Sequence, residues 1–281
     1  MVKLLNQEIV AEFETLLSEP KLRKVGEGLD TNFIKKVELC HQVIRKARPF
    51  EGEMLKQVRD FFRISTTWSS NALEGNTLTI SETKVLLEDG ITVGGKSFRE
   101  ALEAYGHSHA YDYMFSLIDK KTIRESDIKE LHRLFYSGIS ESKAGVYRTV
   151  RVVITGSSYP VCAPDKIGQE IKYLCDWIEK ERSSYDPVTF AAELHRRFIF
   201  IHPFEDGNGR TARLLMNTAL IQKGYLPCVI SPYIRNDYIQ ALEGAHAEPE
   251  KFIRFIAEAE LETEKDFIRA LGLEMPELKN I

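Results

Sequence analysis

Apolar residues recur three and four positions apart over most of the chain, which is the spacing of amphipathic helices. From about residue 53 to 73 this spacing predicts one long helix. The segment Glu74-Gly75-Asn76 ends it, because glycine and asparagine tolerate the left-handed backbone of a helix cap. The following "TISE", residues 79–82, is a capping-box pattern that begins another helix. The pattern therefore predicts a mainly α fold.

Further amphipathic stretches extend this interpretation to "KSFREALEAYGHSHAYDYMFSLI", "RESDIKELHRLFYSGI", "DKIGQEIKYLCDWIEKE", "DPVTFAAELHRRFIF" and "PEKFIRFIAEAELETEKDFIRAL". In the fourth, Asp186 supplies an N-cap and Pro187 a proline at the first helical position. Residues 147–161, "YRTVRVVITGSSYPV", differ: they are rich in β-branched residues and broken at Gly156 and Pro160, which predicts a short strand or β-hairpin. We expect one helical domain with a small β flap.

Composition narrows the possible partners. The 281 residues carry a formal net charge of -4, with 43% hydrophobic and 28% charged residues. This balance is typical of a globular protein and argues against broad electrostatic binding of nucleic acid. The segment after residue 258 is too short for a DNA-reading winged helix. No nucleic-acid partner is expected, and an anionic ligand must be held by a local cluster of positive groups.

No membrane association is expected, because no run reaches the roughly 18 consecutive apolar residues of a membrane-spanning helix. The N-terminal "MVKLLNQEIVAEFETLLSEP" breaks its apolar residues with charges and lacks the apolar core of a signal peptide. The cysteines are scattered, with no C-x-x-C pair, at Cys40, Cys162, Cys175 and Cys228. This usage fits a reducing compartment, so the expected location is cytoplasmic.

The stretch "GITVGGKS", Gly90 to Ser97, satisfies the phosphate-loop pattern G-x-x-x-x-G-K-[ST]. That loop functions between a buried strand and a helix, where its backbone N–H groups converge on phosphate. Here the preceding "SETKVLLED" is charged and helix-like, and no alternation of strands and helices follows. The stretch is therefore interpreted as a glycine-rich turn.

Candidate functional residues are most concentrated in "IHPFEDGNGRTARLLMN", residues 201–217. Apolar residues at 212, 215, 216, 219 and 220 predict a helix that ends near Gly224. Gly207, Asn208 and Gly209 therefore lie at a helix N-terminus, where unpaired N–H groups and the positive end of the dipole favour an anion. The segment predicts an anion-binding site, against the alternative of a capped helix entry with surface arginines.

The charged residues around that helix start extend the hypothesis. Arg210 and Arg213 are three positions apart and both reach one polyphosphate. Asp206 is placed to hold a hard cation such as Mg²⁺ that bridges phosphate oxygens. His202 has an ordinary pKa of about 6.5, so much of it is neutral near neutral pH and accepts a proton. Together they predict a site for a magnesium-bound nucleotide that deprotonates an attacking hydroxyl.

The run H-P-F-x-D-G-N-G-R-x-x-R, His202 to Arg213, resembles the signature of the Fic family, and similarity extends over roughly residues 54–258, including "AGVYR" at 144–148. The resemblance implies a Fic-type helical bundle with a β-hairpin flap that transfers AMP from ATP to a Ser, Thr or Tyr hydroxyl of a target protein. It makes His202 the general base and Asp206 the Mg²⁺ ligand. The ATP-binding residues that it implies are Asp206, Gly207, Asn208, Gly209, Arg210, Thr211, Ala212, Arg213, Tyr238 and His246.

The resemblance also assigns roles outside the signature. Flap residues Thr155, Gly156, Ser157 and Ser158 would align the target segment by strand-like pairing. Tyr238 would lie near adenine, whereas His246 stands where close relatives often carry asparagine. The family likeness makes a homodimer possible. It divides the chain into an N-terminal helical region at 1–100, a catalytic core at 101–262 and a C-terminal helical tail at 263–281.

A second motif, Ser70-x-x-x-Glu74-Gly75, resembles the inhibitory motif of the same family and ends the helix predicted at about 53–76. Glu74 is expected to form a bidentate pair with Arg213 and so occupy the arginine meant for the γ-phosphate. ATP would still bind, but a misplacement of about 1 Å at the reacting phosphorus costs around 100-fold in rate. The alternative without a functional role is a solvated glutamate at a helix end.

Two other functions stay open. The same site would serve a hydrolase that removes AMP, with Glu74 orienting water, or a non-catalytic nucleotide-binding scaffold held closed by Glu74. The remaining candidates favour structural roles: His107 and His109 are two apart, the wrong helical spacing for shared metal ligation, and His195 is expected to be a packed core histidine. Glu205 either tunes the metal or faces solvent.

Overall fold

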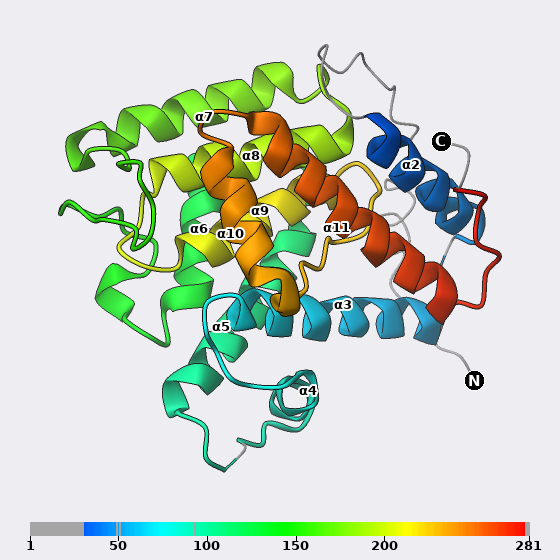
Figure 1. Cartoon of the computed structure of the whole chain (residues 1–281). Helices are drawn as coiled ribbons and strands as arrows, with labels where there is room; N and C mark the ends of the chain where they lie inside the picture. Colours follow the sequence, from blue (N-terminus) through cyan, green and yellow to red (C-terminus); the bar gives the residue numbers. More distant parts are fainter. Residues whose placement is uncertain (1–30, 49, 51, 93, 279–281) are drawn as a thin grey trace.

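The computed structural model describes residues 31–48, 50, 52–92 and 94–278. The N-terminal segment tested above for a signal peptide lies outside these residues, as do 279–281 at the end of the predicted tail. Figure 1 shows the helices, which are α2 (Thr31–Lys46), α3 (Gly52–Ala72), α4 (Ile80–Asp89), α5 (Phe98–Ser116), α6 (Glu125–Tyr136), α7 (Ile167–Glu181), α8 (Pro187–Ile201), α9 (Asn208–Ile221), α10 (Arg235–Gly244) and α11 (Pro249–Ala270). Short 3-10 turns lie at η1 (Glu141–Lys143), η2 (Pro164–Lys166) and η3 (Pro232–Ile234).

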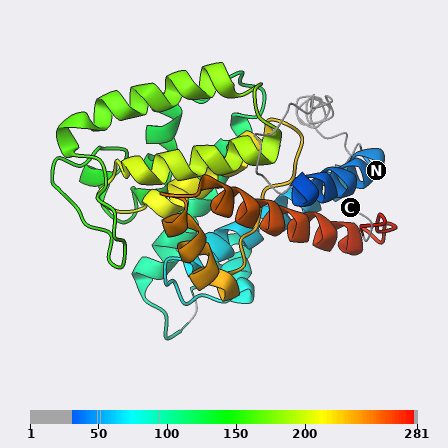
Figure 2. The same ribbon diagram turned by 45° about the horizontal axis from the view of Figure 1, so that its top comes forward.

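Helix α9 is the central element, and every residue from Arg210 to Ile221 is buried. Helix α8 packs along it, while α3, α5 and α6 contact its other sides. Helix α11 covers α8, and α2 lies beside α11 in both Figure 1 and Figure 2. Because α9 is enclosed by its neighbours, the position of its N-terminus is fixed by the core of the protein.

Local capping signals decide where the helices begin and end. Thr79 accepts a hydrogen bond from the backbone of Glu82, and the Glu82 carboxylate accepts one from Thr79 N–H, so the predicted capping box is present. Asp186 caps α8 by accepting from Val188 and Thr189 N–H. The helix predicted at 53–73 is confirmed within one residue at each end, and Gly75 follows it with a φ of 96°.

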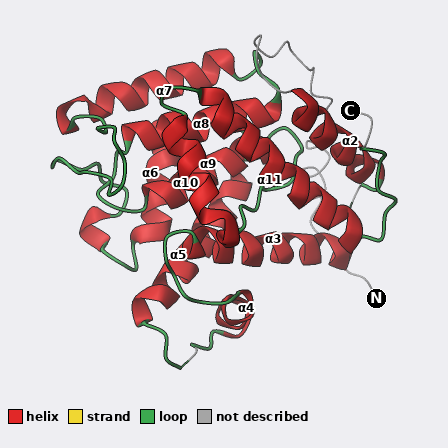
Figure 3. Cartoon of the chain, viewed as in Figure 1, coloured by secondary structure: helices red, strands yellow, loops and turns green. Residues whose placement is uncertain are grey.

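The predicted strand is the main difference. Residues 147–161 are irregular, and Figure 3 shows helix and loop with no strand in the part of the chain that the structure describes. β-branched residues favour extended backbone, but a strand also needs a neighbouring ladder, and the Val153 side chain is 89% exposed. The β-hairpin flap is therefore not confirmed. The glycine-rich turn predicted at 90–97 is confirmed, because Gly90 caps α4 with a φ of 68°.

One hydrophobic cluster joins residues from Ile34 to Ile268. The boundary predicted at 100–101 falls inside α5, and that at 262–263 falls inside α11. The described residues of the three predicted regions therefore contribute to one hydrophobic cluster. Within the described ranges, no helix combines the length and the apolar character needed to cross a bilayer.

Candidate active site

The loop between α8 and α9 has an unusual backbone at both ends. His202 ends α8 with a φ of 51°, the one non-glycine residue with a positive φ among those the structure describes. Gly207 precedes α9 with a φ of 78°, and a Cβ there would lie 2.8 Å from the Phe135 ring. The Asn208 amide closes the loop by donating to the Phe204 carbonyl and accepting from Phe204 N–H. The loop is therefore held in one shape.

His132 supports this loop from α6, a role that the sequence did not reveal. Its ring stacks on Phe204 with centroids 3.7 Å apart. Nδ1 accepts from Gly145 N–H at 2.9 Å, which leaves Nε2 to donate to the Asp206 carbonyl at 3.1 Å. Burial lowers the pKa of His132 to about 4, so the ring is neutral and keeps this tautomer.

His202 lies half-buried where the loop begins. Arg148, from the "AGVYR" segment, donates to the His202 carbonyl at 2.8 Å and fixes its backbone. Burial and, to a smaller extent, Arg148 lower the pKa of His202 to about 4, against the opposing effects of the Ile199 carbonyl and two nearby carboxylates. The imidazole is therefore neutral near neutral pH and able to accept a proton.

The start of α9 holds a carboxylate. A Cβ added to Gly209 would collide with Glu74, because the Glu74 carboxylate lies against the backbone of Gly209. The first N–H groups of a helix have no intrahelical partners and carry partial positive charge, so they favour an anion at this position. Glu74, from the turn that follows α3, therefore occupies the cradle predicted for phosphate.

All three side-chain nitrogens of Arg213 donate hydrogen bonds beside the start of α9. Nη2 donates to Glu74 Oε1 at 2.7 Å and to the Ser70 carbonyl at 2.8 Å. Nε donates to Ser70 Oγ at 2.9 Å, and Nη1 donates to the Tyr238 hydroxyl at 3.2 Å. The predicted bidentate pair is thus wrong in its geometry: Ser70 and Tyr238 take the other nitrogens, so Glu74 meets Arg213 through one oxygen and one nitrogen.

The Glu74 carboxylate is ionised at neutral pH. Burial alone raises the pKa of this carboxyl, but Arg213 and Arg210 outweigh burial and hold its pKa below the ordinary value. The Glu74 side chain is still 35% exposed, whereas Arg213 is buried. The Glu74 carboxylate therefore contacts the buried Arg213 on one side and solvent on the other.

Asp206 and Arg210 lie on the other side of the same loop. The Asp206 carboxylate is partly exposed and accepts from Arg210 Nη2 at 3.4 Å. No group of three or more His, Cys, Asp or Glu side chains in the described ranges is arranged to hold a metal. A single accessible carboxylate beside an anion cradle fits Mg²⁺ nonetheless, because Mg²⁺ uses one or two carboxylates together with substrate phosphates and water.

Three predicted ATP contacts have buried side chains. Thr211 donates to the Gly207 carbonyl at 3.0 Å, and Ala212 belongs to the core. The Tyr238 hydroxyl lies behind Arg213 and 2.9 Å from His195 Nε2. Because Tyr238 accepts from Arg213, its own proton points to His195. His195 is buried, as predicted for a core histidine.

His246 holds the flap segment. Its ring lies between Tyr159, 3.8 Å away, and Phe200, 3.7 Å away, both stacked. Glu243 accepts from Ser157 Oγ at 2.8 Å and from Ser158 N–H at 2.7 Å. Two residues near the end of α10 thus anchor the segment on which Thr155 and Gly156 are exposed.

The other side chains singled out in the sequence lie outside this cluster or support it. His107 is buried and pairs with Thr67, whereas His109 packs beside Tyr105. Glu205 forms an ion pair with Lys143. Gly75, directly after Glu74, has a left-handed backbone with a φ of 96°.

Comparisons with known proteins point to the same loop. The family model described as Fic/DOC family matches residues 122–220. A protein adenylyltransferase Fic from Nematostella vectensis is 39% identical over 194 residues, or 68% of this chain and 45% of that protein. Its namesake from Drosophila mojavensis is 34% identical over 258 residues, or 91% of this chain and 48% of its own length. The chain spans about half the length of these curated relatives.

Solved structures share the fold over most of this chain. A segment of Fic-1 from C. elegans has a TM-score of 0.77 and 29% identity, covering 85% of this chain and 73% of that one. A Fic domain containing signaling protein from Bacteroides thetaiotaomicron has a TM-score of 0.76 and 30% identity, covering 86% of this chain and 99% of its own. With its loop from His202 to Arg213 shaped as an anion cradle, this chain belongs to the Fic/DOC family.

Proposed function

We propose that the chain is a protein adenylyltransferase that transfers AMP from ATP to a hydroxyl of a target protein. The observation that carries the proposal is the pairing of a neutral His202 with an anion cradle at the start of α9. The target hydroxyl oxygen bonds to the α-phosphorus while the bond from that phosphorus to pyrophosphate breaks. His202 takes the hydroxyl proton, and the products are a phosphodiester-linked AMP-protein and pyrophosphate.

The cradle and its arginines bind the triphosphate in this proposal. Gly207 to Gly209 would present backbone N–H groups to phosphate oxygens, once Gly207 N–H leaves Asp206 Oδ1. Arg210 and Arg213 would neutralise the β- and γ-phosphates. Asp206 would hold Mg²⁺, which when bound neutralises phosphate charge. Asn208 acts through the loop it closes, because both ends of its amide are engaged by Phe204.

Glu74 restrains the resting enzyme. Its ionised carboxylate takes the place of a phosphate group against Gly209 and occupies Arg213. A triphosphate must either displace this carboxylate, which weakens its binding, or bind with its γ-phosphate elsewhere, which moves the α-phosphorus from the line of attack.

The flap would present the target. Residues 150–156 are rich in β-branched residues, which favour extended backbone, and Val153 and Thr155 are exposed. Strand-like pairing with a target segment would form a β-ladder there only in the complex, which is consistent with the irregular backbone of the isolated chain. The family likeness also makes a homodimer possible, which light scattering coupled to size-exclusion chromatography tests.

The decisive experiment uses ATP labelled at the α-phosphate with wild type, Glu74→Gly and the double variant Glu74→Gly/His202→Ala. We expect strong protein-bound label only for Glu74→Gly, including self-modification. Equal and negligible labelling of all three proteins, under conditions where each binds ATP, would support the scaffold and reject transfer.

A second candidate is hydrolytic removal of AMP by the same site. The observation that favours it is the ionised and partly exposed Glu74 carboxylate, which is close enough to His202 to affect its pKa. An anionic acceptor at this place would orient a water molecule for attack on an AMP-protein. Release of AMP from a modified target by wild type, lost in Glu74→Gly, would establish this activity.

A further inference from the structure

Each carboxylate oxygen of Asp206 accepts two hydrogen bonds, although the side chain is partly exposed. Oδ2 accepts from Arg99 Nη2 at 3.2 Å and from the Tyr136 hydroxyl at 3.3 Å. Oδ1 accepts from Arg210 Nη2 at 3.4 Å and from Gly207 N–H at 2.6 Å. A cation that binds this carboxylate must therefore displace at least one of these groups.

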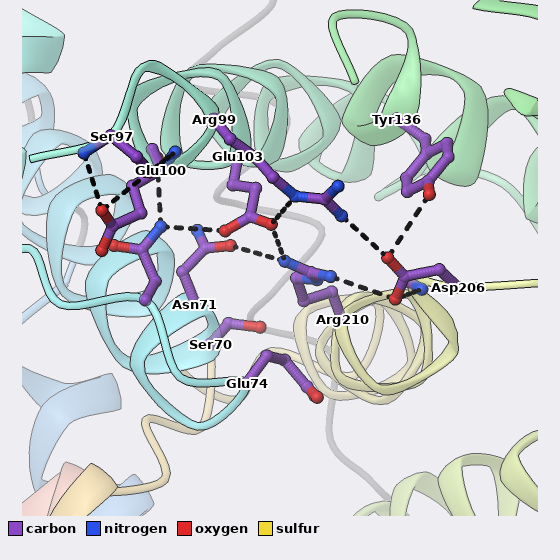
Figure 4. A network of polar contacts seen from close by, with 12 residues as sticks. Ser70, Asn71, Glu74, Ser97, Arg99, Glu100, Glu103, Tyr136, Asp206 and Arg210 are labelled. Atoms are coloured by element: carbon purple, nitrogen blue, oxygen red, sulfur yellow. Dashed lines mark hydrogen bonds and ion pairs between the residues drawn. The ribbon is translucent and has the colours of Figure 1, made fainter. Parts of the chain in front are cut away.

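Two arginines and two acids form a closed ring around the site. Figure 4 shows Arg99 and Arg210 both lying between Asp206 and Glu103. Glu103 Oε1 lies 3.3 Å from Arg99 Nε and 3.4 Å from Arg210 Nη1. The four charges cancel, so a divalent cation added to the intact ring meets two positive neighbours without net negative charge to attract it.

The two arginines differ in how firmly they are held. Arg210 is 4% exposed, lies 4.3 Å from the centre of the Phe135 ring and contacts Asn71. Arg99 projects from the first turn of α5, and its side chain is 58% exposed. When Arg99 leaves Asp206, the buried Glu103 carboxylate keeps Arg210 as a partner, whereas moving Arg210 would break several buried contacts. Arg99 is therefore the group that gives way.

We propose that Arg99 is a displaceable countercharge on Asp206, which competes with the divalent cation and so sets the metal concentration that nucleotide binding requires. This inference rests on the proposed role of Asp206 as the metal ligand. Glu103 supplies the place to which Arg99 withdraws, since Arg99 already contacts it through Nε. The device is separate from Glu74, because Arg99 contacts neither Glu74 nor Arg213 in the structure.

The test measures metal binding rather than turnover. Mn²⁺ is titrated against the whole chain with a non-hydrolysable ATP analogue, and free Mn²⁺ is followed by electron paramagnetic resonance. The affinity for the analogue is measured separately in EDTA. We expect Arg99→Ala to bind Mn²⁺ about 3- to 10-fold more tightly than wild type, since removing an exposed ion pair and its repulsion changes binding by this order. Its metal-free affinity for the analogue should be unchanged.

Two variants serve as controls. Arg99→Lys keeps the charge and should remain within about 2-fold of wild type, because exposed pairs depend mainly on charge. Arg269→Ala removes a comparably exposed arginine (57% against 58%) that pairs with Asp266 at the far end of α11, and it should leave Mn²⁺ affinity unchanged.

The outcomes separate this inference from the proposed function. Unchanged or weaker Mn²⁺ binding by Arg99→Ala, with Mn²⁺ binding lost in Asp206→Asn, overturns the role of Arg99 and leaves Asp206 as the ligand. Wild-type Mn²⁺ affinity in Asp206→Asn rejects the metal assignment itself and the inference with it. Weaker binding of the analogue to Arg99→Ala in EDTA overturns it too, because Arg99 would then be a phosphate ligand.

Discussion

Replacing Glu74 by glycine removes the carboxylate from the cradle and releases one donor of Arg213. A hydrogen bond between charged groups contributes about 1.5–3 kcal/mol when buried, and the Arg213 Nη2 to Glu74 Oε1 distance is 2.7 Å. The Glu74 side chain is 35% exposed, so solvent screening reduces the contribution to about 1–2 kcal/mol. ATP no longer has to displace this contact, and its affinity should rise about 5- to 30-fold.

The rate of transfer should rise by more than the affinity. Alignment of the α-phosphorus contributes around 100-fold for a displacement of about 1 Å, and this gain appears in kcat rather than in binding. Calorimetry with a non-hydrolysable ATP analogue measures the first effect, and the initial rate of label transfer at saturating ATP measures the second. Glu74→Gln keeps the shape without the charge and should fall between wild type and Glu74→Gly.

The matched control for this series is Glu88→Gly, which removes an exposed glutamate at the end of α4 that pairs with Lys84. It should leave both quantities at the wild-type level. Equal ATP affinity and equal transfer rates for wild type and Glu74→Gly would refute the reasoning, since the carboxylate would then not be an obstacle to the triphosphate.

Three further predictions concern other parts of the site. Because the folded pKa of His202 is lowered to about 4, its base form persists at mildly acidic pH, and kcat/KM of Glu74→Gly should fall only as the pH approaches that value; an acid limb near the ordinary pKa of about 6.5 would contradict this. Gly207→Ala forces a Cβ to 2.8 Å from Phe135 at positive φ and should lower the free energy of unfolding by about 1–3 kcal/mol in urea denaturation, whereas Gly168→Ala, with open space around it, should not. His246→Ala removes two stacked contacts and should speed hydrogen exchange in residues 155–160 without lowering the affinity for ATP. A loss of ATP affinity would instead support an adenine contact.

The sequence predicted the helices well because their signals are local. A capping box at Thr79 and an Asp-Pro pair at 186–187 act within one turn, and the structure uses both as expected. The helix after "DGNG" was predicted for the same reason, since glycine, asparagine and the apolar face are all within reach of one another. Local signals failed for residues 147–161. These residues favour extended backbone, but the described structure places no neighbouring strand beside them.

The roles of single side chains were harder to predict because they depend on residues far away in the sequence. His246 lies between Tyr159 and Phe200, so its stacking follows from the packing of α8 and the flap and not from its own neighbours. His132 and Arg148 stand in ordinary helical and loop contexts, and only the fold shows that both support the loop before α9. Arg99 is 107 positions from Asp206.

In the proposed function, Glu74 and the triphosphate compete for the same donors, and this competition limits the strength of the proposed inhibition. Arg213 contacts Ser70 and Tyr238 as well as Glu74, so we expect the exchange of the carboxylate for a phosphate to break only the contact to Glu74. Glu74 is at the exposed end of that contact and belongs to a turn rather than to a helix, so water is able to solvate it as it leaves. We therefore expect that a small change in the free-energy difference between the two states, such as a shift of the end of α3 would cause, replaces Glu74 by phosphate without disturbing the core around α9.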